Sequence, residues 1–429
     1  MHAPFTPKFR AEWRSFADLE AFTEQWCSLA ARAVEPNVFY EPAFARNAAP
    51  VFGRDVGAVL VWSTVGRLMG LFPARHDGMS GTMIGWTHPY APLGVPLVDR
   101  EQAEDVIAAW LDHLAHDAAA PARLMLRFVP EQGPFALALD AVLKRRGQPS
   151  AAFGRHQRAM LDPGAQRHGY LDRSMSAGRR KELRRQRRRL DDIAPLSFVT
   201  ATTPDEVAAA LKDFLVIEAS GWKGIAGTAA VNEPSVRGFV ETAVMTLAAE
   251  GKARVDRILL NGRAIAAAVT LISNNSAWWW KIAYSEGHAR SSPGVQLAID
   301  LTAALLTEPK LARVDSCAIA DHPMIDHVWH ERLTLNDRLI AVKRSAVPFR
   351  IACAVEALRR RAIAAAKAMR DGMRNRKPGA KSGLRPKQAA DHLARGGHGQ
   401  LFDKSDLTRI FMRGEPRPYE RLDVGCKRV

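Results

Sequence analysis

Cysteine is scarce in this sequence: the chain of 429 residues has four, and no two of them form a CxxC pair. The common zinc motifs and a disulfide framework both need regular cysteine spacing, so neither is expected. Three neighbouring histidines also lack the HExxH spacing of a metal-binding helix. We therefore predict no metal site and a reducing compartment. The four cysteines are Cys27, Cys317, Cys353 and Cys426, and the three histidines are His322, His327 and His330.

Long hydrophobic runs are absent as well. No stretch reaches the roughly 18 uncharged apolar residues that a membrane-spanning helix needs. The first residues, MHAPFTPKFRAEW, contain no apolar core of a secretion signal. Neither GxGxxG nor the Walker pattern occurs, which disfavours Rossmann dinucleotide-binding domains and P-loop enzymes. We expect a cytoplasmic protein.

The net excess of positive charge is confined to two places. The formal net charge is +16, and residues 341–429 alone hold 22 Lys/Arg and 8 Asp/Glu. Residues 179–190 add eight basic residues and one acidic residue. Charge this local favours contact with an anionic partner, while the rest of the chain is slightly acidic.

Apolar periodicity divides the chain into two successive halves with the same order of elements: helix, helix, β-hairpin, helix and strand. This order predicts two copies of one α/β unit. The pair Asn261-Gly262 is the strongest hairpin signal. Expected helices are 16–34, 42–52, 101–116, 135–146, 174–190, 203–221, 234–251, 294–307, 323–329 and 349–376, and expected strands are 56–64, 66–74, 122–128, 151–161, 254–260, 263–273, 277–284, 312–318 and 338–342.

The stretch SEGHARSSPG joins an expected strand to an expected helix. Free backbone N–H groups at a helix N-terminus favour an anion, most often a phosphate. Arg290 can add a charged contact, and Gly294 permits close approach of a ligand. The alternative is a helix capped by Ser292 that binds nothing.

Four segments together resemble a known family: SAGRRKELRRQRRRL, EASGWKGIAGTAA, RILLNGRAIAAAVTL and WKIAYSEGHARSSPGVQL. They resemble the GNAT-type acetyltransferase domain of the CelD/BcsL-like group, which is associated with cellulose and exopolysaccharide synthesis and related to Fem-type peptidoglycan transferases. Two earlier segments, EPNVFYEPAFARNAAPVFG and HPYAPLGVPLVD, resemble the N-terminal half of the same group.

The resemblance implies an α/β (α+β) fold of two GNAT-like domains in tandem, each a mixed, mostly antiparallel sheet flanked by helices. The expected parts are an N-terminal domain at 1–165, a C-terminal acyltransferase domain at 166–345, a basic helix at 346–376, and a linker with a partly disordered tail at 377–429. The loop after the fourth strand of the second domain then binds the pyrophosphate of acetyl-CoA or another acyl-CoA. Here a serine and a proline stand where that loop usually has glycine. The implied cofactor-binding residues are Arg290, Ser291, Ser292, Gly294 and Val295.

Acyl transfer needs a base for the acceptor's proton and an acid for the leaving thiolate. The base candidates are Glu218, Asp315 and Asp321, and Tyr284 is the acid candidate. Each also has an ordinary structural explanation as a solvated helix residue, turn contact or core-edge ring. Substrate-binding candidates are Trp222, Lys223, Lys281 and Asp321.

The run Trp278–Trp280 is aromatic on both faces of a strand, which predicts a strand buried between two layers. Strict alternation assigns Trp280 to one face and Lys281 to the other. A lysine on a buried face needs a partner or a ligand, so Lys281 is the residue of greatest functional interest.

These patterns predict an acyl-CoA-dependent N- or O-acyltransferase that acts on a sugar, amino sugar or related envelope precursor. The alternatives are a non-catalytic accessory protein of a polysaccharide synthase complex and an aminoacyl-tRNA-dependent Fem-type transferase. Expected partners are a small-molecule or lipid-linked sugar acceptor and, through the basic helices, the anionic inner membrane face. A nucleic-acid partner is disfavoured because no aromatic residues are interleaved with the basic charge.

Overall fold

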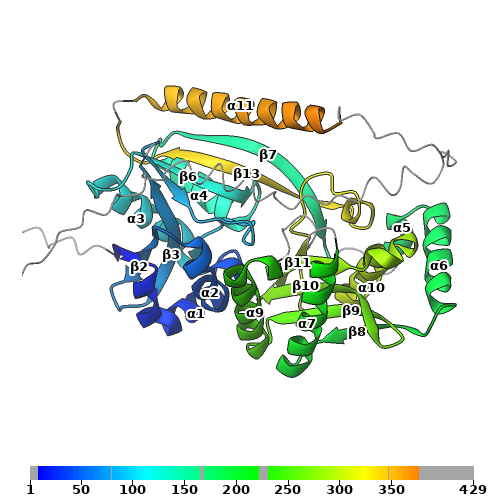
Figure 1. Cartoon of the computed structure of the whole chain (residues 1–429). Coiled ribbons are helices and arrows are strands. Elements are labelled where there is room, and N and C mark those ends of the chain that lie inside the picture. Colours follow the sequence, from blue (N-terminus) through cyan, green and yellow to red (C-terminus); the bar gives the residue numbers. More distant parts are fainter. Residues whose placement is uncertain (1–7, 79, 165–168, 222–229, 346, 376–429) are drawn as a thin grey trace, which may run out of the picture.

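The computed structural model describes residues 8–78, 80–164, 169–221, 230–345 and 347–375. Thirteen strands of these residues form one sheet, in the order β1-β2-β3-β4-β6-β13-β7-β12-β11-β10-β9-β8, with β5 paired to β3 (Figure 1). Two of the neighbouring pairs, β4–β6 and β11–β12, are parallel and the others are antiparallel. The predicted fold class, a mixed α/β sheet flanked by helices, is confirmed.

The first half contributes elements at both the edge and the centre of this sheet. They are β1 Phe9–Ser15, η1 Ala17–Phe22, α1 Thr23–Ala31, η2 Val38–Tyr40, α2 Pro42–Phe52, β2 Val56–Ser63, β3 Leu68–Asp77, β4 Thr82–Gly85, β5 Leu97–Val98, η3 Arg100–Gln102, α3 Ala103–His116, β6 Arg123–Pro130, α4 Pro134–Arg145 and β7 Ser150–Leu161.

The second half repeats this order of elements, and its first strand, β8, forms the opposite edge of the sheet. Its elements are α5 Tyr170–Ser174, α6 Ala177–Asp191, β8 Leu196–Ala201, α7 Pro204–Ser220, η4 Ala230–Asn232, α9 Pro234–Ala249, β9 Ala253–Leu260, β10 Arg263–Ser273, β11 Ser276–Tyr284, η5 Glu286–Ser291, α10 Pro293–Thr307, β12 Arg313–Asp315, η6 Ile325–His327 and β13 Glu331–Ala341. The helix α11, Phe349–Asn375, follows.

Local signals place most of these elements as predicted. The turn between β9 and β10 has positive φ angles at Asn261 (50°) and Gly262 (74°), as a type I′ hairpin requires. Gly251, with φ 68°, follows the end of α9 as a C-terminal cap glycine. Helix α7 begins with a capping box of Thr203 and Glu206.

The two halves exchange their last strands. Strand β13, from the second half, pairs with β6 of the first half. Strand β7, from the first half, pairs with β12 of the second half, and β7 and β13 also pair with each other. The sheet therefore continues without a break across the predicted boundary at residue 165, and the long strands β7 and β13 join the halves (Figure 1).

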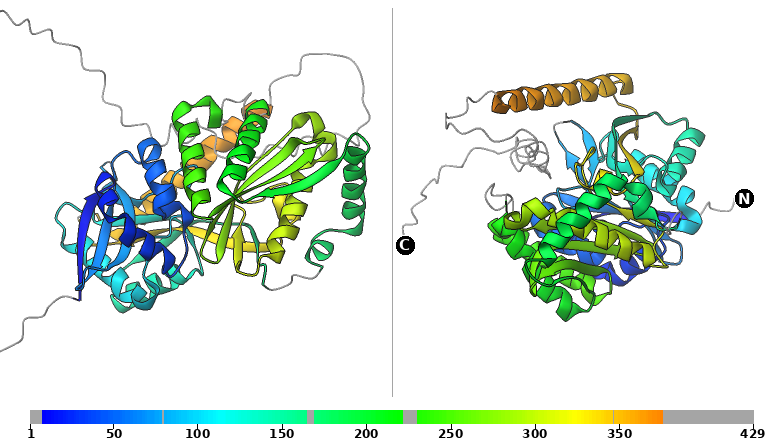
Figure 2. Two further views of the ribbon diagram at one scale, coloured as in Figure 1. Left: turned by 90° about the horizontal axis from the view of Figure 1, so that it is seen from below. Right: turned by 90° about the vertical axis from the view of Figure 1, so that its right-hand side faces the viewer.

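Helices cover both faces of the second half. Helices α7 and α9 pack on one face of β9–β11, and α10 packs on the other (Figure 2). The first face shares a hydrophobic core with the first half of the chain, because α2 packs against α9. The second face has a separate core that includes Leu297, Leu301 and Trp329.

The three tryptophans of β11 lie in these two cores, which confirms that this strand is buried between layers. Trp278 and Trp280 belong to the first core, and Trp279 packs against Trp329 at a ring distance of 5.4 Å in the second. The prediction that Trp280 and Lys281 lie on opposite faces of the strand was wrong. A β-bulge leaves Trp280 without a register partner in β10, so Trp280 and Lys281 lie on the same side of the sheet.

His88 lies in the aromatic part of the first core. Its ring stacks on Phe52 at 4.4 Å, and neither ring nitrogen has a hydrogen-bond partner among the described residues. Burial lowers the pKa of His88 to about 3, so the imidazole is neutral in the folded protein.

This burial predicts an acid-dependent loss of stability. Below pH ~6.5 the unfolded chain binds a proton on His88 and the folded chain does not. The free energy of unfolding therefore decreases, and the protein becomes less stable, as pH decreases from there toward the folded-state pKa. The slope from this residue is at most about 1.4 kcal/mol per pH unit. Denaturant unfolding of the wild type and of His88→Phe across pH 4–8 measures it. The stability difference should be constant above neutral pH and shift in favour of the variant in acid; a difference independent of pH would contradict the prediction.

Candidate functional site

Strands β11 and β12 pair for only three residues and then separate. The pairing covers Ser276–Trp278 of β11, although β11 continues to Tyr284. Strand β12 ends at Asp315 because its carboxylate accepts the N–H of Cys317 at 2.9 Å and Cys317 adopts a left-handed φ of 52°. The expected strand at 312–318 is therefore shorter than predicted. Beyond Trp278, the edge of β11 that faced β12 pairs with no other described strand.

A cavity of about 130 Å³ opens beside this separation. Both halves of the chain line it: β11, the segment after β12, the loop after β4, and the exchanged strand β7. The lining residues are Pro89, Tyr90, Pro92, Phe128, His156, Arg158, Trp280, Lys281, Cys317, Ala318, Ile319 and Ala320.

Lys281 reaches this cavity from the bulged part of β11. The side chain is 8% exposed, and its Nζ lies 3.7 Å from Oε1 of Glu218 on α7 and 4.2 Å from the centre of the Tyr90 ring. Burial lowers the pKa of Lys281, while the Glu218 carboxylate opposes this shift. Glu218 also accepts the N–H of Ala230 at 3.0 Å. The structure thus brings together two of the predicted residues: Glu218, predicted as a base, is the ion-pair partner of Lys281, and Lys281 lines the cavity.

Arg158 supplies a second buried cation, and sequence reasoning missed it. It extends from β7 and donates to the carboxylate of Asp315 and to the carbonyl of Pro92 at 3.0 Å, while its Nε has no hydrogen-bond partner among the described residues. Asp315, predicted as a base, is therefore bound to Arg158 and to the turn at Cys317. These contacts indicate that Asp315 helps to keep β11 and β12 apart.

His156 is a further cavity residue that the sequence did not reveal, because it stands on a half-exposed strand of the other half. Its Nδ1 lies 2.9 Å from the carbonyl oxygen of Gly154. A carbonyl can only accept, so the hydrogen is on Nδ1, and Nε2 of the neutral ring is a proton acceptor.

The loop at η5 and the start of α10 differ from the predicted anion cradle. Pro293 has no N–H, and the N–H of Val295 donates to the Ser292 carbonyl at 2.9 Å, so fewer backbone donors are free. Ser292 has φ 50° and makes no side-chain cap to the helix. Ser291 is buried, while Arg290 is exposed at the surface of the loop.

Gly294 is explained by packing against protein. A Cβ at this position would lie 2.9 Å from Cδ1 of Tyr284, so the close packing of the ring is sufficient to require a glycine here. Tyr284 is not a lining residue of the cavity. Burial, with a smaller contribution from Glu286, raises its pKa.

The remaining predicted residues lie elsewhere. Asp321 is exposed, with φ 55°, and does not line the cavity. Trp222 and Lys223 lie outside the described residues. His322 accepts the N–H groups of Met324 and Ile325 and so caps a turn. Across the described ranges, no cluster of three or more potential metal ligands occurs.

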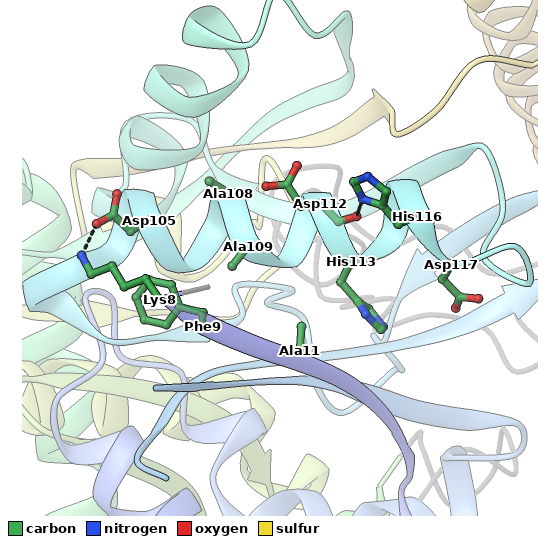
Figure 3. Close-up of a pocket in the computed structure, with 10 residues that line it drawn as sticks. All are labelled: Lys8, Phe9, Ala11, Asp105, Ala108, Ala109, Asp112, His113, His116 and Asp117. Atoms are coloured by element: carbon green, nitrogen blue, oxygen red, sulfur yellow. Dashed lines mark hydrogen bonds and ion pairs between the residues drawn. The ribbon is translucent and has the colours of Figure 1, made fainter. Parts of the chain in front are cut away.

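A larger hollow, of about 770 Å³, is lined by residues of the first half (Figure 3). It is an open groove between β1 and α3. Its floor is alanine, and the 2.6 Å ion pair of Lys8 and Asp105 stands at one end. The smaller cavity beside β11 has the buried charged groups, so it is the candidate active site.

The separated parallel strands, the bulge and the loop before α10 lie within one recognisable segment. Residues 177–322 match the family profile described as "Acetyltransferase (GNAT) domain". The chain therefore contains a GNAT-type acyltransferase domain, as predicted. No curated protein is significantly similar to the chain in sequence.

Several solved structures are similar to the chain, and the similarity to FemX supports the fold. FemX superposes with a TM-score of 0.51 at 8% identity, over 77% of this chain and 97% of that chain. The C-terminal domain of a candidate lysylphosphatidylglycerol synthetase from Agrobacterium fabrum has a TM-score of 0.49 at 13% identity, over 79% and 95%. A tandem GNAT protein from the clavulanic acid pathway has a TM-score of 0.40 at 17% identity, over 79% and 99%.

The buried pair of Lys281 and Glu218 gives a testable energetic signature. Lys281→Met leaves a buried carboxylate without its cation and should cost about 3–5 kcal/mol, whereas replacing both charges leaves neither uncompensated. The double variant Lys281→Met/Glu218→Gln should therefore be more stable than Lys281→Met alone, as measured by denaturant unfolding. Strictly additive losses would show that the two side chains are not coupled.

Proposed function

We propose that this chain is an acyl-CoA-dependent N- or O-acyltransferase, and that its acceptor is a sugar, amino sugar or related envelope or exopolysaccharide precursor. The observation that carries the proposal is the opening between β11 and β12, where an unpaired strand edge meets a cavity with buried cations. The GNAT domain match supports an acyl-CoA donor. The resemblance to the CelD/BcsL-like group supports the acceptor class.

The unpaired edge of β11 suits the acyl donor. The arm of CoA contains amide groups, and amides can hydrogen-bond to a free strand edge as another strand would. A thioester lying along this edge brings its reacting carbonyl toward Lys281. The phosphates then lie toward η5 and the N-terminus of α10, where Arg290 is exposed.

Direct attack by the acceptor is the mechanism that the cavity side chains favour. The acceptor nitrogen or oxygen forms a bond to the thioester carbon, and Nε2 of His156 takes the proton. The Lys281 ammonium stabilises the oxyanion before the C–S bond breaks and the thiolate leaves. A covalent intermediate on Cys317 is disfavoured, because burial raises the pKa of its thiol well above the usual range.

Ligand-induced stabilisation tests the donor. Acetyl-CoA or a longer acyl-CoA should raise the melting temperature, because a ligand that binds only the folded state adds RT ln(1 + [L]/Kd) to its stability. Arg290→Gln should weaken this shift, and Arg237→Gln, an exposed residue of α9 that does not line the cavity, should not. Absence of a shift with any acyl-CoA at millimolar concentration would reject the donor.

Kinetics test the proton acceptor. His156→Gln keeps a polar side chain but removes the base, and kcat should fall by about 10²–10⁴-fold with a smaller change in KM. The exposed His327, which does not line the cavity, provides the control His327→Gln. Equal activity of the two variants would remove His156 from the mechanism.

An aminoacyl-tRNA-dependent transferase is the second candidate. Helix α6 packs beside η5, and Gln296 of α10 donates to the carbonyl of Leu183 at 2.9 Å. The outward face of α6 therefore places a row of basic residues near the loop: Lys181, Arg184, Arg185, Arg188 and Arg189. Stabilisation by tRNA and not by acyl-CoA would favour this candidate, and stabilisation by neither would favour a non-catalytic accessory protein.

A further inference from the structure

Helix α11 lies along the outside of the molecule, above β7 and β13 (Figures 1 and 2). The side chains of its first turns that point inward dock on the sheet. Phe349 and Cys353 pack against a small core of Ile84, Met125 and Leu339. Arg360 pairs with Asp337 of β13 at 2.6 Å and lies 5.4 Å from the centre of the Phe153 ring. These contacts fix which face of the helix points away from the body.

The outward face is apolar. Its large side chains are spaced three, four, seven or eleven residues apart, so at about 100° per residue they form one stripe. Ile351 is 52% exposed, Val355 61%, Leu358 67% and Met369 61%. Alanines fill the stripe between them, and from Arg361 to Met369 every side chain is exposed. Nothing in the described part of the chain covers this surface.

Arginines border the stripe on both sides. On the helical wheel, Arg350 and Arg361 lie along one edge and Arg359 along the other. Glu356 lies on the inward side and is engaged by Arg359 and Arg360 at 2.7 and 2.6 Å. The apolar stripe of α11 therefore has cations at its edges and no described carboxylate on the outward side.

This charge pattern indicates which kind of partner covers the apolar stripe of α11. A second copy of the chain would oppose one row of arginines with another, and residues 376–429 are themselves rich in Lys and Arg. Neither is complementary to the helix. An anionic bilayer is complementary to the helix. It accepts a shallow apolar stripe at the acyl boundary, and it attracts the bordering cations by about 1 kcal/mol for each Lys or Arg near the surface.

We infer that α11 is an in-plane membrane-binding helix, which holds the enzyme on an anionic lipid surface through its outward apolar stripe and the bordering arginines. No helix in the described ranges is long and apolar enough to cross a bilayer, and this inference does not need one. Helix α6 is excluded from the same role, because its outward face is basic without an apolar stripe. The inference is independent of the proposed catalytic chemistry.

Vesicle flotation of the full chain tests the inference. The chain should float with vesicles of phosphatidylcholine and phosphatidylglycerol, much less with phosphatidylcholine alone, and less with the anionic vesicles as salt concentration rises. Val355→Glu/Leu358→Glu should reduce recovery at least tenfold. Val65→Glu/Leu137→Glu, which places the same two charges at side chains 86% and 59% exposed outside α11, should leave recovery unchanged. Arg350→Gln/Arg361→Gln should weaken binding to the anionic vesicles.

Three results would overturn the inference: equal recovery with both vesicle types, equal recovery of wild type and Val355→Glu/Leu358→Glu, or no flotation at all. Sedimentation without vesicles identifies a second copy as the occupant if the wild type dimerises and the double variant does not. The altered side chains are exposed, so unchanged circular dichroism and melting temperature confirm that each variant is folded.

Discussion

The pairing of β7 with β12 is the constraint on which the site depends. Strand β7 comes from the first half, yet it lies beside the last paired residues of β11 and β12 and supplies one wall of the cavity. Arg158 on β7 binds Asp315, and Asp315 in turn accepts the N–H of Cys317, which directs the chain out of the sheet. One buried ion pair thus joins the two halves and keeps the parallel strands apart. Without the exchange, the second half would have a complete family profile but an incomplete cavity.

The elements themselves follow closely from sequence patterns. Helices such as Pro42–Phe52 and the hairpin at Asn261-Gly262 carry strong local signals, and their bounds were predictable. Strands β1, β4, β5 and β8 escaped prediction. Phe9–Ser15 mixes aromatic and charged residues, and Leu196–Ala201 is a short, half-buried edge strand. The strand exchange was not predictable, because no local pattern states which distant strand will be a neighbour.

The site was predictable to the extent that its residues lie within one half. Lys281 was identified because a lysine in an aromatic strand needs a partner, and Glu218 is that partner. The bulge at Trp280, which turns Lys281 toward Glu218, has no signature in the strict alternation of a strand. His156 and Arg158 could not be identified, since only the tertiary pairing of β7 brings them to the cavity. Gly294 was predicted to leave space for a ligand, and no sequence signal indicated that the ring of Tyr284 also packs against it.

The exchange of β7 and β13 also has a consequence for how this chain is made. During synthesis, the first half emerges with β6 unpaired on one side, because its neighbour β13 ends only at Ala341. The second half cannot complete its sheet without β7, which was made long before. The contacts that close the sheet therefore connect residues far apart in sequence, which slows folding. Unpaired strand edges persist until nearly all of the described chain has emerged, so the nascent protein passes through an aggregation-prone stage that its tandem architecture would not by itself imply.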